Sequence, residues 1–277
     1  MNPLQRLRHE ARLAAVALQF LTRVPVQFRQ FHPQWLQDCA RHFPLVGAGV
    51  GGFGAAVLLA ALQAWPAPVA VGLAMAATVW LTGGLHEDGL ADTCDGLGGA
   101  VDRARALLIM KDSRLGSYGA LGLLLTLGLK AAVLTVLAQR QPLLAAAALV
   151  LAHAWSRTGA VALLAWLPYA GDAEHAKAKP LAQHIGPLAL AAALAWCALL
   201  AALVPWLATW LNGAAGPLAG LSPLRLVLAA LAAAGVALWC GRWLRRRLGG
   251  FTGDGLGATQ QWCELGVYLA LAVGHGA

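Results

Sequence analysis

Long apolar stretches, each close to the length of a membrane-spanning helix, fill most of the chain after residue 44. Crossing about 30 Å of hydrocarbon at about 1.5 Å per residue takes about 20 apolar residues. Only 12% of the residues are charged and 59% are hydrophobic, against about a quarter and about 45–50% in an ordinary soluble domain. The sequence therefore predicts an all-α, polytopic integral membrane protein. Seven spans are predicted, at about 44–64, 69–85, 117–138, 143–167, 187–211, 224–240 and 258–273.

No stretch outside these segments has the composition of a soluble domain, so we expect a single membrane domain over residues 1–277. The segment 11–28 is apolar but short, and it is interrupted by Arg23 and flanked by further arginines. This pattern is typical of an interfacial helix that lies on the bilayer. It lacks a small-residue cleavage site, so we do not expect a removable signal peptide. The five cysteines are dispersed, which argues against a disulfide framework or a zinc site.

The basic residues are distributed unevenly between the two sides of the membrane that seven spans define. With a cytoplasmic N-terminus, the cytoplasmic segments are the head of the chain and residues 86–116, 168–186 and 241–257. They hold sixteen of the twenty lysines and arginines, namely Arg6, Arg8, Arg12, Arg23, Arg29, Arg41, Arg103, Arg105, Lys111, Arg114, Lys177, Lys179, Arg242, Arg245, Arg246 and Arg247. The positive-inside rule predicts this orientation. Orientation in the bilayer then accounts for the net charge of +8, and no nucleic-acid partner is expected.

All the acidic residues except Glu264 fall on the predicted cytoplasmic side, and three of them share a motif. In the stretch HEDGLADTCDGLGG, Asp88, Asp92 and Asp95 are spaced so that a helix places them on one face. Carboxylates a few ångströms apart repel by roughly 3 kcal/mol at an effective dielectric of about 20. We therefore expect a divalent cation there, and oxygen ligands favour magnesium or manganese over zinc. The alternative is a solvated acidic turn paired with nearby arginines.

A compact group of polar residues follows this motif and precedes the third predicted span. Asp112 offers one more oxygen ligand, and Lys111 and Arg114 offer two cationic donors on either side of it, with Ser113 between them. Next to a bound metal, such a group is typical of phosphate chemistry. The alternative for the two cations is an ordinary positive-inside flank of a span.

The acidic motif has a partial echo late in the chain. The stretch GDGLGAT places Asp254 where the first motif has Asp88, with Thr252 just before it. This repetition predicts a second metal or phosphate subsite at the start of the last span. The alternative is a glycine-rich helix start that Asp254 caps.

Three ionisable residues fall within or near the predicted spans: Lys130, Arg157 and Glu264. Charged groups inside a membrane are costly, so they are usually functional or paired with one another. Arg157 is accompanied by His153 and Ser156 in a segment made otherwise of alanine, leucine and valine. A substrate-facing role is therefore predicted for this segment, with ion pairing as the alternative.

Several of these motifs, in the same order and spacing, resemble the cobalamin synthase family from about residue 16 to 270. They are FLTRVPV from Phe20, HEDGLADTCDGLGG from His86, MKDSRLGSYGALGLLL from Met110, the SR pair at Ser156 and GGFTGDGLGA from Gly249. The resemblance implies a multi-pass protein of the bacterial inner membrane with its N-terminus and active site in the cytoplasm. It also implies an enzyme that joins adenosylcobinamide-GDP to α-ribazole or α-ribazole 5′-phosphate with Mg2+ and releases GMP.

The resemblance and the acidic pattern together assign residues to this reaction. Magnesium is expected on Asp88, Asp92, Asp95 and Asp112, while Lys111 and Arg114 stabilise the leaving GMP. By analogy with membrane CDP-alcohol phosphotransferases, Asp95 is expected to accept the proton of the attacking hydroxyl. The residues expected to bind substrate are Arg23, Glu87, Ser113, Lys130, Ser156, Arg157, Thr252 and Asp254.

Other interpretations stay open beside this one. They are another magnesium-dependent membrane phosphotransferase and a cation transporter that uses the same aspartates. Transport sites lie near the middle of the bilayer, whereas this cluster is predicted at its edge. The lipid bilayer is the one partner that composition requires; a homo-oligomer and association with other cobalamin-assembly enzymes are further options. The stretch PYAGDAEHAKAKPLAQ from Pro168 departs from the family pattern, which leaves the role of the loop 168–186 open.

Overall fold

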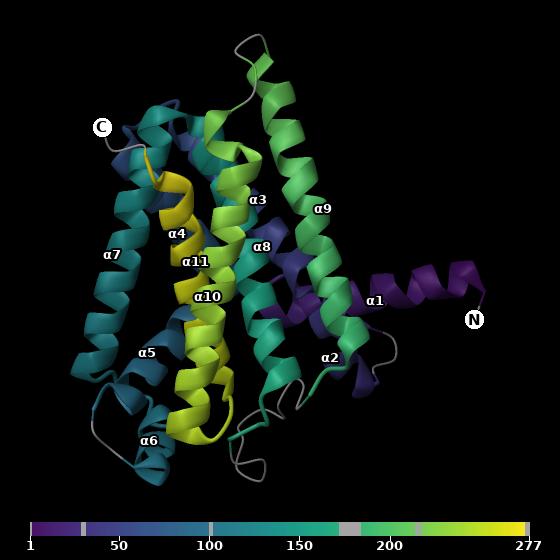
Figure 1. The fold of residues 1–277 in the computed structure, drawn as a ribbon, viewed down its shortest axis with the longest axis vertical. Coiled ribbons are helices and arrows are strands. Elements are labelled where there is room, and N and C mark those ends of the chain that lie inside the picture. Colours follow the sequence, from purple (N-terminus) through teal and green to yellow (C-terminus); the bar gives the residue numbers. More distant parts are fainter. Residues whose placement is uncertain are drawn as a thin grey trace.

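The computed structural model describes residues 2–28, 32–99, 102–171, 184–213, 216 and 218–274. These residues form a bundle of helices, which confirms the predicted all-α membrane architecture (Figure 1). The elements are α1 (Pro3–Leu21), α2 (Gln34–Asp38), η1 (Cys39–His42), α3 (Phe43–Ala61), α4 (Ala67–Thr82), α5 (Leu85–Gly98), α6 (Arg103–Met110), α7 (Ser117–Arg140), α8 (Pro142–Trp166), α9 (Pro187–Asn212), η3 (Ala219–Leu221), α10 (Pro223–Leu248) and α11 (Gly253–Ala272).

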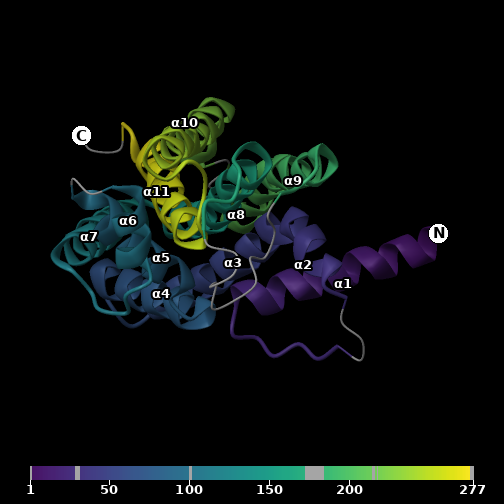
Figure 2. The ribbon, with the colours of Figure 1, turned by 90° about the horizontal axis from the view of Figure 1, so that it is seen from below.

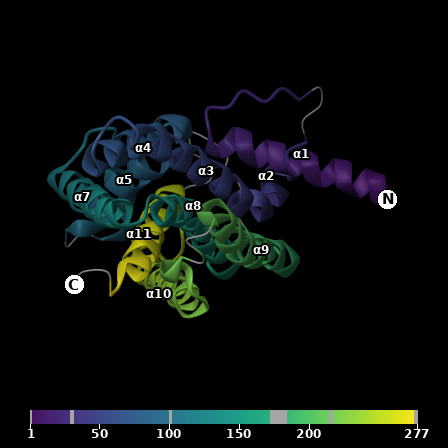
Figure 3. The same cartoon turned by 90° about the horizontal axis from the view of Figure 1, so that it is seen from above.

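Helix α8 is the centre of the bundle, with α3, α7, α9, α10 and α11 packed around it (Figures 1 and 3). It is rich in alanine, and α3 presents Gly47 and Gly51 to it. A Cβ atom on either glycine would come within 3.0 Å of the α8 backbone at His153 or Leu149. Small residues allow this close approach, and packing of this kind drives the association of helices in membranes.

Within the described residues, five helical segments are long and apolar enough to cross a membrane, and a sixth span results if α4 and α5 count as one bent segment. The predicted number of seven is therefore not confirmed, although each predicted segment lies on a helix. Two predicted spans are not among the five: 69–85, whose helix α4 passes only together with α5, and 258–273, which coincides with α11. Its residues Gln260, Gln261 and Glu264 are buried inside the protein, so α11 is a polar helix that the bundle encloses.

A helix is present in the segment predicted to be interfacial, but its bounds differ from the predicted 11–28. Helix α1 runs from Pro3 to Leu21 and lies across the direction of the long helices (Figures 1 and 2). It starts early because Asn2 and Gln5 form a capping box ahead of Pro3. The chain is no longer helical at residues 22–28, where Pro25 disfavours a helix.

Helix α10 is longer than the predicted span 224–240, because it continues to Leu248. Arginine is a good helix former, and cations are favourable in the last turn of a helix. The arginines Arg245, Arg246 and Arg247 therefore extend α10 instead of forming a loop, and Gly249 ends it with a φ of 80°.

A sharp bend separates α4 from α5 and sets the direction of the acidic motif. Gly83 and Gly84 have φ angles of 72° and 74°, in the left-handed region that favours glycine. The two helices meet at 90°. Helix α5 thus leaves the direction of the long helices and lies toward the lower end of the bundle in Figure 1, close to α6 and to the start of α11.

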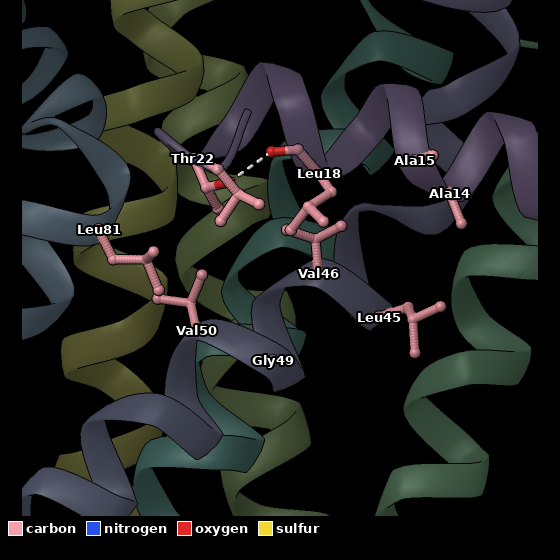
Figure 4. Close-up of a pocket in the computed structure, with 10 residues that line it drawn as sticks. Ala14, Ala15, Leu18, Thr22, Leu45, Val46, Gly49, Val50 and Leu81 are labelled. Atoms are coloured by element: carbon pink, nitrogen blue, oxygen red, sulfur yellow. Dashed lines mark hydrogen bonds between the residues drawn. The ribbon is translucent and has the colours of Figure 1, made fainter. Parts of the chain in front are cut away.

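An apolar groove of about 430 Å³ lies where α1 crosses α3 and α4 (Figure 4). Leu18, Val46 and Leu81 are among the side chains that line it. Its one hydroxyl, on Thr22, donates to the carbonyl of Leu18 at 2.7 Å. The groove therefore presents hydrocarbon and no charged group, and it does not suit a phosphorylated substrate.

Candidate active site

The three aspartates of the HEDGLADTCDGLGG motif lie on helix α5, as predicted. Asp88 is exposed, and Asp92 and Asp95 are half-buried. In the described part of the chain, neither Asp88 nor Asp92 makes a side-chain hydrogen bond or an ion pair. We call the side chains of Asp88, Asp92 and Asp254, which α11 adds to them, the acidic face.

Asp254 reaches the acidic face because two glycines bring α5 and α11 into contact. A Cβ atom on Gly89 would lie 2.9 Å from the Asp254 carbonyl oxygen and 3.3 Å from the Gly257 Cα atom. The cap of α11 is Thr252, whose hydroxyl accepts the N–H of Gly255 at 3.0 Å. The alternative in which Asp254 caps this helix is therefore wrong. Thr252 itself is buried, and its hydroxyl is engaged in that cap.

The carboxylates of the acidic face act on one another, and they lie on α5 and the first turn of α11, neither of which is among the five segments long and apolar enough to cross a membrane. Burial raises the pKa of Asp92 to about 7, and the carboxylates of Asp254, Asp88 and Asp95 add to this shift. Burial and the charge of Asp88 raise the pKa of Asp254 to about 6. Among the described residues, no side-chain cation contributes to either shift. The face therefore carries unbalanced negative charge.

This face suits magnesium in its donor chemistry, but it is not a ready-made coordination shell. In the described ranges, no group of three or more His, Cys, Asp or Glu side chains is arranged to hold a metal ion. Magnesium typically binds through one or two carboxylates together with substrate phosphates, and it retains water ligands. Hard oxygen donors with mutually raised pKa values fit such a partial site.

Asp95 is engaged differently from the other two aspartates of α5. Its Oδ2 accepts the backbone N–H of Gly116 at 2.8 Å, and its Oδ1 accepts that of Gly119 at 2.7 Å. Both donors belong to the N-terminus of α7, whose N-cap residue is Gly116. The carboxylate of Asp95 thus faces α7.

The segment between α6 and α7 carries Lys111, Asp112, Ser113 and Arg114. Lys111, Ser113 and Arg114 are exposed. The guanidinium of Arg114 holds both oxygens of Asp112, with an Nη2–Oδ2 distance of 2.6 Å. These hydrogen bonds lower the pKa of Asp112 to about 2. Asp112 is therefore paired within its own segment, and its predicted role as a metal ligand requires that Arg114 release it.

Lys130 and Glu264, predicted inside the membrane, pair with each other. The Lys130 Nζ atom lies 2.9 Å from Glu264 Oε1 and donates to Gln261 at 2.7 Å. Gln261 in turn donates to Glu87 Oε1 at 2.9 Å. Lys130 is 3% exposed and Glu264 is 4% exposed. This chain of contacts ties α7, α11 and α5 together directly beside the acidic face, and it occupies the ammonium group for which we predicted substrate contact.

Arg157 is buried in the same interior, with 2% of its surface exposed. Its Nη1 donates to the carbonyl of His153 at 2.8 Å. Ser156 accepts a hydrogen bond from Gln260 at 3.0 Å. The Nε of Arg157 and the Oε2 of Glu87 are buried without a hydrogen-bond partner. The structure therefore places these predicted substrate-binding residues in a buried polar interior under the acidic face, with donor and acceptor capacity left over.

Arg23 lies at the bend between α4 and α5. Its backbone N–H donates to the Leu81 carbonyl at 2.8 Å, and its guanidinium lies against Gly83. The side chain is exposed. Arg23 thus contacts the bend that sets the direction of α5.

One residue that positions α5 was not predicted from the sequence. Arg247 of α10 donates to the carbonyls of Leu97 and Gly99, at 3.0 and 2.9 Å, and so satisfies the C-terminal end of α5. From the sequence, Arg247 is one of the basic residues that the positive-inside rule assigns to the cytoplasmic side. No local signal identifies such a contact, because its partners lie about 150 residues away in the sequence.

Part of the loop 168–186 lies outside the described residues, at 172–183. The part before it is anchored at the lower end of the bundle, where Ala170 donates to the Phe251 carbonyl at 2.8 Å. Arg103 of α6 donates to the carbonyl of the same Ala170 at 3.3 Å. The loop therefore starts beside the turn that precedes Asp254.

The fold and this site define a class: a multi-pass membrane protein with a cluster of carboxylates at one end of its helical bundle. The family model for cobalamin-5-phosphate synthase matches residues 13–272. The chain belongs to the cobalamin-5-phosphate synthase family.

Relatives named adenosylcobinamide-GDP ribazoletransferase match nearly the whole chain. The protein from Leptothrix cholodnii is 60% identical over 269 residues, which is 97% of each chain. Those from Albidiferax ferrireducens and Shewanella amazonensis are 46% and 43% identical, over 94% and 95% of this chain and 96% of their own lengths. No solved structure matches the chain.

Proposed function

We propose that this chain is an adenosylcobinamide-GDP ribazoletransferase, which joins adenosylcobinamide-GDP to α-ribazole or its 5′-phosphate and releases GMP. The family membership and the names of relatives that span the whole chain support the reaction. The single observation that carries the site is the contact of Gly89 with Gly257, which adds Asp254 to the aspartates of α5. That contact builds one acidic face from two distant motifs.

The reaction breaks the bond between the cobinamide phosphate and GMP and forms a bond from that phosphate to the ribose hydroxyl of α-ribazole. Its barrier lies mainly in positioning the groups and neutralising phosphate charge. Lys111 and Arg114 are exposed beside the start of α7 and would stabilise the charge that develops on GMP. The hydroxyl proton passes to a carboxylate. The sequence predicts Asp95 as this acceptor, whereas the geometry favours Asp92, because α7 holds the carboxylate of Asp95 and not that of Asp92.

Asp88, Asp92 and Asp254 would hold magnesium together with the pyrophosphate of the substrate, and Asp112 could join them if Arg114 releases it. The ion would supply charge neutralisation at the phosphates. The proposed magnesium requirement rests on the unbalanced negative charge of the acidic face and on its oxygen donors.

The acidic face is proposed to open to the cytoplasm of a bacterial inner membrane. Helix α6, which begins at Arg103, and the C-terminal end of α10 lie at the same end of the bundle as α5, whereas the C-terminal end of α9 lies at the opposite end (Figure 1). The positive-inside rule then assigns the end with the arginines to the cytoplasm, where phosphorylated substrates are available.

A transfer assay with the purified full chain in detergent tests the proposal. We expect adenosylcobalamin, or its 5′-phosphate, and GMP to form in equal amounts from adenosylcobinamide-GDP and the ribazole substrate. Chelation of magnesium should stop the reaction, and added magnesium should restore it. Transfer without a second compartment also excludes a purely transport function. Absence of both products from folded protein would refute the proposed reaction.

A matched pair of variants connects the activity with the acidic face. Asp88→Asn should lower turnover by about 100-fold or more, because it removes a carboxylate proposed to hold the magnesium ion that neutralises phosphate charge. Asp102→Asn is the control, since Asp102 caps α6 by accepting the N–H of Arg105 at 2.8 Å and asparagine caps equally well. Equal activities of the two variants would contradict the assignment.

A further inference from the structure

Asp95 of α5 caps the N-terminus of a second helix, α7. The first N–H groups of a helix lack partners within it, and a polar side chain at the N-cap position usually satisfies them. Helix α7 has glycine at that position and no cap of its own. Asp95, more than 20 residues earlier, accepts the N–H of Gly116 and of Gly119 at 2.8 and 2.7 Å. A carboxylate is also favourable at the positive end of the helix dipole.

This contact explains the glycines at position 116, the N-cap of α7, and at position 119, in its first turn. A Cβ atom on Gly116 or on Gly119 would come within 3.0 Å of the Asp95 carboxylate. A Cβ atom on Gly128, on the same helix, would meet nothing within 4 Å. A Cβ atom on Gly122 would also meet α5, at 2.5 Å from Cys94 Sγ, so α7 lies close to α5 over its first two turns, and the Asp95 carboxylate contacts it in the first.

The contact also fixes the segment that carries Lys111 and Arg114. This segment ends at Gly116, so a carboxylate that holds Gly116 determines where both cations stand relative to α5. Both carboxylate oxygens of Asp95 accept hydrogen bonds from the N-terminus of α7. The carboxylate of Asp92, in contrast, makes no hydrogen bond in the described chain.

We propose that Asp95 is a positioning residue. It docks the N-terminus of α7, and with it the Lys111–Arg114 segment, onto α5. The effect on turnover rests on the proposed function; the docking itself does not. On this account Asp95 acts through Lys111 and Arg114 and does not receive the proton of the attacking hydroxyl.

Hydrogen exchange in detergent measures the docking independently of activity. In Asp95→Asn the amides of residues 116–119 should exchange at least about tenfold faster than in the unmodified chain. Gly119→Ala should have the same effect because its Cβ atom would meet the Asp95 carboxylate and, at 2.9 Å, the Ala91 carbonyl oxygen, and so separates α7 from the capping carboxylate. Gly128→Ala should have no effect. Unchanged exchange in both Asp95→Asn and Gly119→Ala would overturn the proposal.

Kinetics then distinguish positioning from proton transfer and from a purely structural role. Asp95→Asn and Gly119→Ala should each lower kcat about tenfold, with KM changed less than about threefold and thermal stability largely retained. In an Arg114→Ala background, Asp95→Asn should cost less than about threefold, because coupled residues are not additive. A loss of about 1,000-fold in Asp95→Asn, unchanged by Arg114→Ala and absent from Gly119→Ala, would make Asp95 the base and overturn the proposal. An inactive unmodified chain would refute the proposed function but leave the exchange result intact.

Discussion

The substitution Gly89→Ala probes the contact that joins α5 to α11. Its Cβ atom would lie 2.9 Å from the carbonyl oxygen and 3.0 Å from the Cα atom of Asp254. Ordinary contacts of a Cβ atom begin at about 3.4 Å, so the two helices must move apart by about half an ångström. Both neighbours are backbone atoms and cannot rotate away. Overpacking of this size costs about 1–3 kcal/mol.

The same displacement should reduce transfer more than it reduces stability. A misplacement of about 1 Å can cost about 100-fold in rate, so we expect kcat to fall about tenfold. The assay is GMP release by purified protein, with thermal denaturation measured on the same sample. Gly72→Ala in α4 is the control, because its Cβ atom would meet nothing within 4 Å. Normal kcat and stability in Gly89→Ala would refute the idea that this contact assembles the site.

Three further predictions address the interior, the topology and the buried arginine. Glu264→Gln should destabilise the protein by about 3–5 kcal/mol, because it leaves the buried ammonium of Lys130 without its ion pair; an unchanged melting temperature would contradict this. A single cysteine near Arg246 in a cysteine-free background should be shielded from an impermeant thiol reagent in intact cells, and one near Asn212 should be labelled. The reverse pattern would place the acidic face outside the cell. Arg157→Ala should impair substrate use more than folding; a large loss of thermal stability with unchanged specific activity would instead make Arg157 a structural residue.

The sequence predicted the long helices because hydrocarbon requires runs of apolar residues, and those runs are continuous and local. It also predicted that the aspartates of α5 share a face, since helical spacing alone determines this. The repeated Asp-Gly-Leu pattern suggested that Asp254 belongs near Asp88, and the structure brings their helices together through Gly89 and Gly257.

Contacts between distant residues could not be predicted from spacing. The pairing of Lys130 with Glu264 and the cap that Asp95 forms on α7 depend on which helices become neighbours. The bend at Gly83–Gly84 was equally hidden, because glycine permits the left-handed conformation without requiring it. The polar residues at the start of α11 are tolerated because they are buried among the neighbouring helices.

Asp254 offers the most direct test of the account, because it joins the acidic face only through the fold. We expect Asp254→Asn to raise the magnesium concentration that half-saturates transfer by about tenfold, since it removes one carboxylate from the face. The measurement is the rate of GMP release against magnesium concentration, for this variant and for the unmodified chain. An unchanged magnesium dependence with an unchanged maximal rate would contradict a transfer site built from α5 and α11 together.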